Sequence, residues 1–329
     1  MWLFYLPIGL WIALLSLRFK GLTFTAVNPG LPVSGLYGEQ KSRLLSQLKD
    51  KQNPMLARFV CLPIKLSFAD RCHLAAEFMQ QHQLQLPVVL KPETGQRGSH
   101  VVIVKTQEQL QAVLQAQIED CLLQEYIEGL EFGVFYIKNY SSVNHHSGYI
   151  YSLTQKCFPT VVGDDQTTLR ELILKHPRGH LSARLFFQQH YHQLDRVLAD
   201  KQSMKLVELG THSRGSLFVD SMHNHTSALQ QAVEKIVDDL DGFYFGRMDI
   251  RVPDLQQLHQ GQGIKVLEIN GVTSEATHIY DPRYSVFYAY RVMFKQWWQA
   301  FQLGENNIKQ HNATALSLKQ FIQYVKQRS

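Results

Sequence analysis

Three oxygen-bearing side chains stand inside apolar, strand-like runs in the second half of the chain. Glu268 and Asn270 lie two residues apart in IKVLEIN, so a strand with its period of two points both to the same face. Asp249 lies in GRMDIRV, where Arg247 would share its face. A buried carboxylate is unfavourable unless it is paired or binds a metal. If the two runs are neighbouring strands, Asp249, Glu268 and Asn270 converge on a hard cation such as Mg²⁺.

A glycine-containing loop joins two β-rich runs in PVVLKPETGQRGSHVVIV, residues 87–104. Gly95 and Gly98 would let backbone amides approach phosphate oxygens. The loop is neither a P-loop nor a strand-to-helix GxGxxG motif, and a glycine in a hairpin usually marks only a turn. Lys91 ends the first run beside the loop, and an ammonium group near amide donors predicts a phosphate site.

Strand-like and helix-like segments alternate along the rest of the chain. Residues 20–86 predict a short α/β unit in which LTFTAVN and ARFVCLPIKL are strands, and GEQKSRLLSQL and residues 69–85 are helices. The stretch CLLQEYIEGLEFGVFYI predicts two strands joined by a polar turn. Lys156 falls on the next strand, and Thr168 and Glu171 form a capping box that opens a helix. The predicted fold class is α/β (α+β).

Composition argues against several classes of protein. The chain has 329 residues with 45% hydrophobic content, which is typical of a globular protein with a large core. Its net charge of +5 comes from scattered Lys and Arg residues, so we do not expect it to bind nucleic acid. The four cysteines form no CxxC pair, which indicates reduced thiols. The histidine pairs in HYH and HNH lack a supporting cluster, so we assign them no metal.

The N-terminal stretch MWLFYLPIGLWIALLSL contains no charge and is followed by Arg18 and Lys20. A membrane span needs about 17 to 20 apolar residues, so residues 1–17 are a marginal transmembrane helix. No basic segment precedes the apolar run and no clear cleavage site ends it, which argues against a signal peptide. We therefore predict that residues 1–19 form a helix that anchors a cytoplasmic protein to the inner face of a membrane. The alternative is a helix packed on the protein's own core or in a homodimer interface.

The C-terminal stretch, residues 306–329, predicts an amphipathic tail helix. Leu318, Phe321, Ile322 and Val325 fall at helical spacing, with basic residues on other faces. Such a helix docks onto its own protein or lies on an anionic membrane surface.

Five stretches follow one another in the order found in a known superfamily: VVLKPETGQRGSHVVIV, LLQEYIEGLEFGV, FPTVVGDDQTTLREL, GRMDI and VLEIN. Over about residues 87–285 the sequence resembles ATP-grasp proteins, in particular the D-alanine:D-alanine ligase-like and cyanophycin synthetase-like branches. More narrowly it resembles bacterial single-chain members with an apolar N-terminus, an NPG segment and a SEATHIYD loop. The resemblance implies two α+β subdomains that grip ATP, a nucleotide-binding one at 87–150 and a catalytic one at 151–305.

The resemblance also implies a role for each matching position. Lys91 and Lys156 would hold the nucleotide phosphates, and the loop from Gly95 through Gly98 to Ser99 would close over them. The adenine would lie at the hinge formed by Gln124, Glu125 and the residues up to Ile127, and Glu131 would bind the ribose hydroxyls. Asp249, Glu268 and Asn270 would bind Mg²⁺, or Mn²⁺ in its place, and Arg247 would face the transferred phosphoryl group.

Two departures affect the substrate side. Gln124 stands where an acid is common, so the adenine contact there would rest mainly on backbone groups. GVTSEATH follows Asn270 in place of a Ser/Thr-Pro-Gly turn, so D-alanine is not transferred as a substrate. We expect His212 and Arg214 of GTHSRGSLF to line the acyl-phosphate pocket, against the alternative of a surface turn. Ser274, Glu275 and His278 are candidates for substrate recognition, against the alternative of a merely structural loop.

The resemblance implies a ligase that activates a carboxylate with ATP and passes the acyl group to an amine. The carboxylate and amine would be small molecules or lipid-linked groups, the latter if the membrane anchor holds. Two alternatives remain open: a kinase that phosphorylates a hydroxyl, and a nucleotide-binding regulatory module without turnover. The second is disfavoured because pure sensing does not require an arginine that faces the phosphoryl group.

Overall fold

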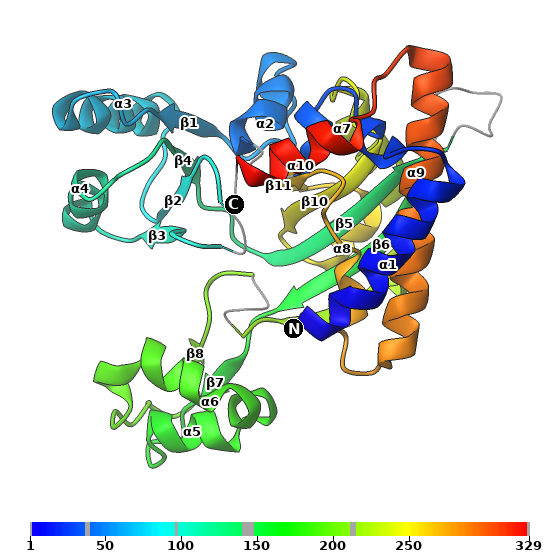
Figure 1. The fold of residues 1–329 in the computed structure, drawn as a ribbon. Helices are drawn as coiled ribbons and strands as arrows, with labels where there is room; N and C mark the ends of the chain where they lie inside the picture. Colours follow the sequence, from blue (N-terminus) through cyan, green and yellow to red (C-terminus); the bar gives the residue numbers. More distant parts are fainter. Residues whose placement is uncertain (1, 37–39, 96–97, 140–147, 211–214, 328–329) are drawn as a thin grey trace.

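The computed structural model describes residues 2–36, 40–95, 98–139, 148–210 and 215–327. Within these ranges, helices pack on antiparallel sheets of four, five and two strands, which confirms the predicted α+β class. Figure 1 shows three lobes: the four-stranded sheet and its helices at the left, the five-stranded sheet and its helices at the right, and a small lobe below.

The four-stranded sheet has the order β1-β4-β2-β3. Its apolar residues pack against α3 and α4, which lie on its outer side (Figure 1). The predicted hairpin is confirmed, since Val88 pairs with Val104 across β2 and β3. The elements of this lobe are β1 (Phe59–Leu62), α3 (Phe68–Gln81), β2 (Val88–Pro92), β3 (Val102–Val104), α4 (Gln107–Gln115) and β4 (Cys121–Glu125).

The five-stranded sheet has the order β11-β10-β5-β6-β9 and carries the main cores on its two faces. Phe132, Val134 and Tyr136 of β5 pack against α2, α7 and α8, and Phe135 and Ile137 point to the other face, against α9. The bounds are α2 (Lys41–Asp50), β5 (Leu130–Lys138), β6 (Gly148–Cys157), β9 (Leu217–Asp220), α7 (Ser227–Asp238), β10 (Phe245–Val252), α8 (Leu255–Gln260), β11 (Lys265–Asn270) and α9 (Val286–His311). The α9 helix covers only part of its face, and Glu131 and Gly133 lie on the same face beyond it.

The small lobe is inserted between β6 and β9 and has a core of its own. It consists of β7 (Thr160–Val162), α5 (Leu169–Lys175), α6 (Pro177–Gln189), η3 (Tyr191–Gln193) and β8 (Ser203–Lys205). The predicted capping box is confirmed, because Thr168 and Glu171 each bond the backbone N–H of the other.

The prediction of a strand at LTFTAVN is wrong. Its residues form a buried 3₁₀ turn, η1 (Thr23–Ala26), and η2 (Pro32–Gly35) follows. The turn packs along α9, where Thr23 Oγ1 donates to Phe301 O and Asn307 Nδ2 donates to Ala26 O. A methyl group at Gly304 would overlap Thr23 O, so this close backbone approach requires glycine. Tertiary packing therefore overrides the β propensity of the segment.

The helix predicted at residues 1–19 is present as α1 (Trp2–Arg18), and one of its sides packs along α9. Among the described residues, no helix combines the length and the apolar character that crossing a membrane requires. The tail helix is α10 (Leu318–Lys326), of which Phe321 and Tyr324 pack on the α9 core. Leu318, Ile322 and Val325 of α10 stay exposed. The remaining 3₁₀ turns are η5 (Met222–Asn224) and η6 (Thr277–Tyr280).

Candidate active site

The register of β11, β10, β5 and β6 gathers the predicted catalytic residues on one face of the large sheet. Asp249 of β10 lies opposite Glu268 of β11, and Arg247 lies opposite Asn270, which confirms that the two runs are neighbouring strands. On the other side of β10, Glu131 of β5 lies opposite Arg251 and also opposite Lys156 of β6. Directly opposite side chains on one face of a sheet lie close together, so charge gathers here.

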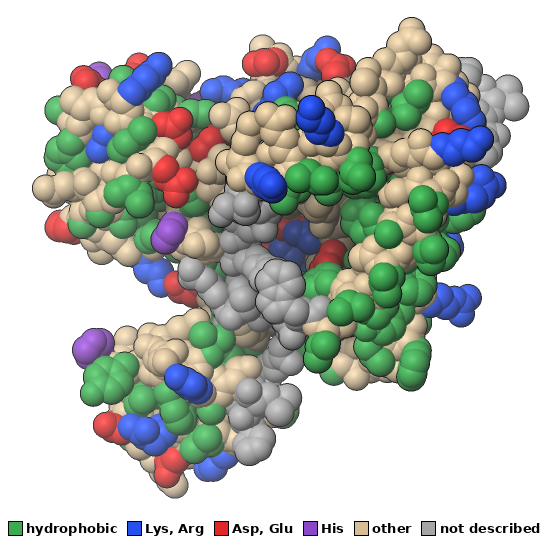
Figure 2. Space-filling view, viewed as in Figure 1, with side chains coloured by type: hydrophobic (Ala, Val, Ile, Leu, Met, Phe, Trp, Pro, Cys, Tyr) green, Lys and Arg blue, Asp and Glu red, His purple; other side chains and the backbone are tan. Residues whose placement is uncertain are grey.

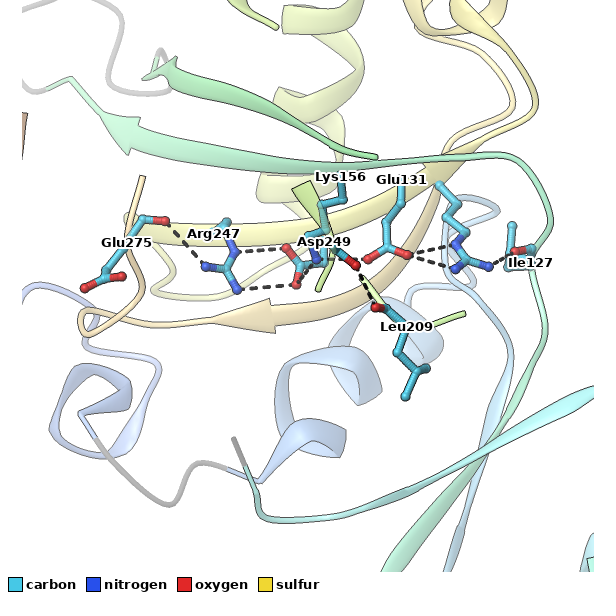
Figure 3. Close-up of polar contacts among 9 residues, drawn as sticks. Ile127, Glu131, Lys156, Leu209, Arg247, Asp249 and Glu275 are labelled. Carbon is cyan, nitrogen blue, oxygen red and sulfur yellow. Dashed lines mark hydrogen bonds and ion pairs between the residues drawn. The ribbon is translucent and has the colours of Figure 1, made fainter. Parts of the chain in front are cut away.

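These charged groups form a row of alternating sign in which all but the half-buried Arg247 are buried (Figure 3). Arg247 Nε lies 2.9 Å from Asp249 Oδ1, and Asp249 Oδ2 lies 2.9 Å from Lys156 Nζ. Lys156 Nζ donates to Glu131 Oε1 at 2.9 Å, and Arg251 Nη2 donates to Glu131 Oε2 at 2.9 Å. We call these five residues the charge row. Three cations and two carboxylates leave it one positive charge, which favours an anionic ligand.

Neighbouring charges decide the protonation states within the charge row. Burial would raise the pKa of Asp249, but Arg247 and Lys156 hold it well below its usual range. Burial would likewise raise the pKa of Glu131, and Lys156 and Arg251 lower it. Burial disfavours the Lys156 ammonium, yet Asp249 and Glu131 raise its pKa above the ordinary value. Asp249, Glu131 and Lys156 are therefore charged at neutral pH.

The donor set at the predicted metal site fits a hard cation. Asp249 and Glu268 supply carboxylate oxygens and Asn270 an amide oxygen, which are ligands that Mg²⁺ prefers. The buried Nδ2 of Asn270 has no hydrogen-bond partner among the described residues, so its amide is not committed to the fold. A methyl group added at Gly133 would lie 3.2 Å from Arg247 Cδ, so glycine leaves room for the arginine beside Asp249. Within the described residues, no three His, Cys, Asp or Glu side chains form a metal cluster, so the candidate set is two carboxylates and one amide.

Lys91 lies between the two large lobes and is buried. Its Nζ donates to Gln124 Oε1 at 2.9 Å and to Leu267 O at 2.8 Å. Burial lowers the pKa of Lys91 to about 8, although Glu268 nearby opposes the shift. Gln124 is committed too, because its Nε2 also donates to Leu267 O. Gln124, which stands where an acid is common, thus helps to join the four-stranded sheet to β11.

The glycine-rich loop is described at Gly95, Gly98 and Ser99, and its residues 96–97 lie outside the described ranges. Gly98 has a φ of 69°, which favours glycine. Lys41, at the start of α2, donates from Nζ to Pro92 O at 2.9 Å and to Gly95 O at 3.2 Å. Lys41 is a cation at the predicted phosphate loop that sequence reasoning missed. The available signal was a lysine at the start of the predicted helix GEQKSRLLSQL, some fifty residues before the loop.

Arg251 is a second residue that sequence reasoning missed. Besides its two hydrogen bonds to Glu131, its guanidinium donates to Ile127 O and lies 5.3 Å from the ring centre of Tyr126. It therefore ties the predicted adenine hinge to the predicted ribose carboxylate. Its signal was present, because Arg251 shares the alternating face of GRMDIRV with Arg247 and Asp249. Glu125 of the same hinge instead pairs with Arg58 at 3.2 Å.

The loop after β11 is tied to α9. Gln296 donates to Ser274 O at 2.8 Å and accepts from Ala276 N, while the Ser274 hydroxyl bonds Gly271 O. The Ser274 hydroxyl thus stabilises the turn in which it lies. Arg247 Nη1 donates to Glu275 O at 3.4 Å, so this loop borders one end of the charge row (Figure 3).

His278 lies beside the same sheet face and bonds Ser152 Oγ through Nδ1 at 2.8 Å. Burial lowers the pKa of His278 against the opposing influence of Asp220 and Asp281, so the ring is neutral at pH 7. Gly210 lies directly over Glu131, where a methyl group would overlap the carboxylate. The predicted substrate residues His212 and Arg214 follow Gly210 but lie outside the described residues.

One protein family matches the sequence. Residues 47–133 match the RimK-like ATP-grasp domain. The predicted ATP-grasp resemblance is confirmed. The matched segment contains Lys91, the glycine-rich loop, the hinge at 124–127 and Glu131, and it ends before Lys156. Comparison with curated proteins gives no match.

Solved structures of a glutathione synthetase and of D-alanine–D-alanine ligases resemble this chain loosely. A bifunctional glutathione synthetase from Pasteurella multocida shares 17% identity at a TM-score of 0.39, over 78% of this chain and 36% of that one. A D-alanine–D-alanine ligase from Bacillus anthracis shares 13% sequence identity at a TM-score of 0.44, over 89% of this chain and 72% of that one. The D-alanine–D-alanine ligase from Coxiella burnetii shares 9% sequence identity at a TM-score of 0.45, over 89% of this chain and 61% of that one. The chain thus spans about a third of the first of these proteins.

Proposed function

We propose that this ATP-grasp chain is a Mg²⁺- and ATP-dependent ligase that joins a carboxylate to an amine. The observation that carries the proposal is the buried charge row, flanked on β11 by Glu268 and Asn270. Four of the five charges are buried, which is costly, and a purely structural role is served as well by apolar residues of similar size. A site that binds and activates an anionic nucleotide would use these buried charges.

In this proposal the nucleotide binds between the two large lobes. The hinge at Gln124 to Ile127 receives the adenine and Glu131 binds the ribose. Lys91 and the glycine-rich loop bind phosphate oxygens. Lys41 holds that loop through hydrogen bonds to Pro92 O and Gly95 O. Lys156 turns from its carboxylate partners toward a phosphate, which is a stronger local anion than either neighbour. Lys156 of the charge row therefore changes partner when ATP arrives.

Asp249, Glu268 and Asn270 would hold the magnesium, and Mn²⁺ fits the same oxygen donors. The ion, when bound, neutralises phosphate oxygens and so favours transfer of the γ-phosphoryl group. Asp249 lies beside Arg247 and Lys156, so one carboxylate serves both the metal and the two cations.

The reaction follows from this charge distribution. A carboxylate oxygen of the substrate attacks the γ-phosphorus, the bond to the β-phosphate oxygen breaks, and ADP leaves. Arg247 and Lys156 stabilise the charge that develops on the phosphoryl oxygens. The amine nitrogen then attacks the acyl carbon, inorganic phosphate leaves and the nitrogen gives up a proton. Positioning and fixed charge carry most of the catalysis in such chemistry.

Hydroxylamine trapping tests the proposal. The purified chain is incubated with Mg-ATP, hydroxylamine and either soluble or lipid extracts, and new hydroxamates are sought by mass spectrometry. A hydroxamate that requires ATP and is absent with the Asp249→Asn/Glu268→Gln variant is the expected result, and its mass identifies the acid. ADP release without any hydroxamate would contradict the ligase and favour phosphoryl transfer to a hydroxyl.

A further inference from the structure

The outward side of α1 is an uninterrupted row of exposed leucines. Leu3 and Leu17, at the two ends, are 84% and 78% exposed, and the leucines between them are 58–61% exposed. We call the row the leucine face; its members are Leu3, Leu6, Leu10, Leu14 and Leu17. Gly9 and Ala13 are exposed between them, so no polar side chain interrupts the face along a helix roughly 25 Å long.

The opposite side of α1 is held against the protein. Ile8 and Leu15 are buried, and Phe4 stacks on Tyr290 with ring centres 5.1 Å apart. Trp11 Nε1 donates to Phe294 O at 3.0 Å. The helix therefore offers one face to its surroundings and keeps the other on α9, which is the arrangement of a helix that lies along a surface.

Charge around the leucine face is of one sign. Arg18 and Lys20 end α1, and Arg291 and Lys295 are exposed on the part of α9 along which α1 packs. Neither α1 nor α9 up to Gly304 contains an Asp or Glu. In Figure 2, hydrophobic side chains cover the right side of the molecule over α1 and α9, and basic side chains border them. An apolar strip with basic neighbours complements a bilayer that carries anionic headgroups.

A second copy of the chain fits this surface less well. Helix pairs in water commonly fix their register with charged or polar residues beside the apolar seam, and the leucine face has none within α1 before Arg18. A two-fold pair would also bring together two surfaces that are both bordered by cations, with no Asp or Glu on α1 to offset them. A bilayer needs no register and neutralises the cations. We propose that the leucine face docks on an anionic lipid bilayer, with α1 lying in the membrane plane.

Vesicle co-sedimentation of the full chain tests this proposal independently of any ligase activity. Vesicles of phosphatidylglycerol and phosphatidylcholine should pellet the protein, and the Leu6→Gln/Leu10→Gln/Leu14→Gln variant should lose about tenfold or more in partitioning, since each buried leucine contributes separately. Phosphatidylcholine alone should bind more weakly, and added salt should weaken only the anionic interaction. These three leucines point outward, so the variant should keep the circular dichroism spectrum of the original chain.

The matched control places the same substitution on other surfaces. Ile118→Gln with Leu174→Gln alters two aliphatic side chains that are 83% and 45% exposed, and vesicle binding should not change. A full chain that stays in the supernatant with anionic vesicles overturns the proposal. Equal binding by the triple variant overturns it as well. A dimer that dissociates in the triple variant, without vesicle binding by the original chain, would instead assign the leucine face to a second copy.

Discussion

The charge row and the leucine face depart from the ordinary distribution of side chains in opposite directions. Glu131, Lys156 and Asp249 are charged yet at most 6% exposed, whereas Leu3 is apolar and 84% exposed. Carboxylates and lysines are rarely buried without partners, and large apolar patches are rarely left in water. Burying charge costs folding free energy, and leaving leucines exposed forgoes the gain that their burial would bring, so each region marks a surface prepared for something outside the chain.

The two regions differ in how far the protein itself offsets that cost. In the charge row every carboxylate has two cationic neighbours, so the fold satisfies the buried charges before any ligand arrives. The leucine face has no such internal compensation. We therefore expect substitutions in the charge row to affect both folding and catalysis, and substitutions on the leucine face to affect only association.

The largest expected effect is on turnover. Asp249→Asn with Glu268→Gln should lower ADP release by about a thousandfold or more, because the phosphates lose their metal-mediated charge compensation. A coupled assay for ADP measures it. Asp195→Asn with Glu208→Gln makes the same changes at exposed ion pairs and should leave turnover intact. Undiminished ADP release by the first variant would refute the assigned metal site.

The next effect is on stability. Glu131→Gln should lower the free energy of unfolding by about 3–5 kcal/mol, because it leaves Arg251 without a carboxylate and Lys156 with only one. Glu208→Gln removes the exposed pair with Lys105 and should cost at most about 1 kcal/mol. Urea denaturation gives both values. Equal losses would mean that burial does not distinguish the two pairs.

A pH dependence follows from Lys91. Its pKa falls from 10.5 to about 8 on folding, so the fold favours the neutral amine. This stabilising contribution is fully present above pH 10.5 and is lost as the pH falls through about 8. The difference in unfolding free energy between the original chain and Lys91→Met should therefore change by up to about 3 kcal/mol between pH 8 and 10.5, in favour of the original chain at high pH.

Urea denaturation at several pH values measures that difference, and parallel profiles for the two chains would contradict the buried cation. Binding of ATP should reverse the shift, because phosphate oxygens favour the ammonium. Calorimetric titration near pH 8 in buffers of different ionisation enthalpy should then show proton uptake that Lys91→Met lacks.

A smaller effect tests how α1 is joined to the site. Tyr5 OH lies 2.9 Å from Tyr280 OH, which in turn donates to the carboxylate of Glu275. Tyr5→Phe should lower the unfolding free energy by about 1 kcal/mol, as expected for one hydrogen bond, and raise the KM for the substrate that contacts the Glu275 loop. Tyr191→Phe, at a 72% exposed ring, is the control. An unchanged KM would leave Tyr5 a purely structural residue.

The smallest effect should come from the leucine face. Leu10→Ala should change the unfolding free energy in solution by less than about 0.5 kcal/mol, whereas Leu15→Ala, on the buried side of the same helix, should cost about 2–5 kcal/mol. Thermal denaturation of both variants compares the two sides directly. A large loss from Leu10→Ala would show that the leucine face already packs against protein in solution.

The sequence alone determined the strands that carry Asp249, Glu268 and Asn270, because a polar pair at period two inside an apolar run is intelligible only on a strand. It also determined the hairpin at Lys91 and the capping box at Thr168, since both depend on neighbouring residues. These are local patterns whose physics acts within a few residues.

Only the tertiary structure decided which distant groups meet. The approach of Lys41 to Gly95 O and of Arg251 to both Glu131 and Ile127 O depends on lobe packing and on strand order. Alternation along GRMDIRV places Arg251 on the face of Asp249, but it does not identify these partners. Packing against α9 likewise turned LTFTAVN into a 3₁₀ segment and divided the uniformly apolar α1 into a buried and an exposed side. Burial is a property of the whole fold. Because α1 is apolar throughout, no pattern of polar and apolar residues could show which side of that helix would remain uncovered.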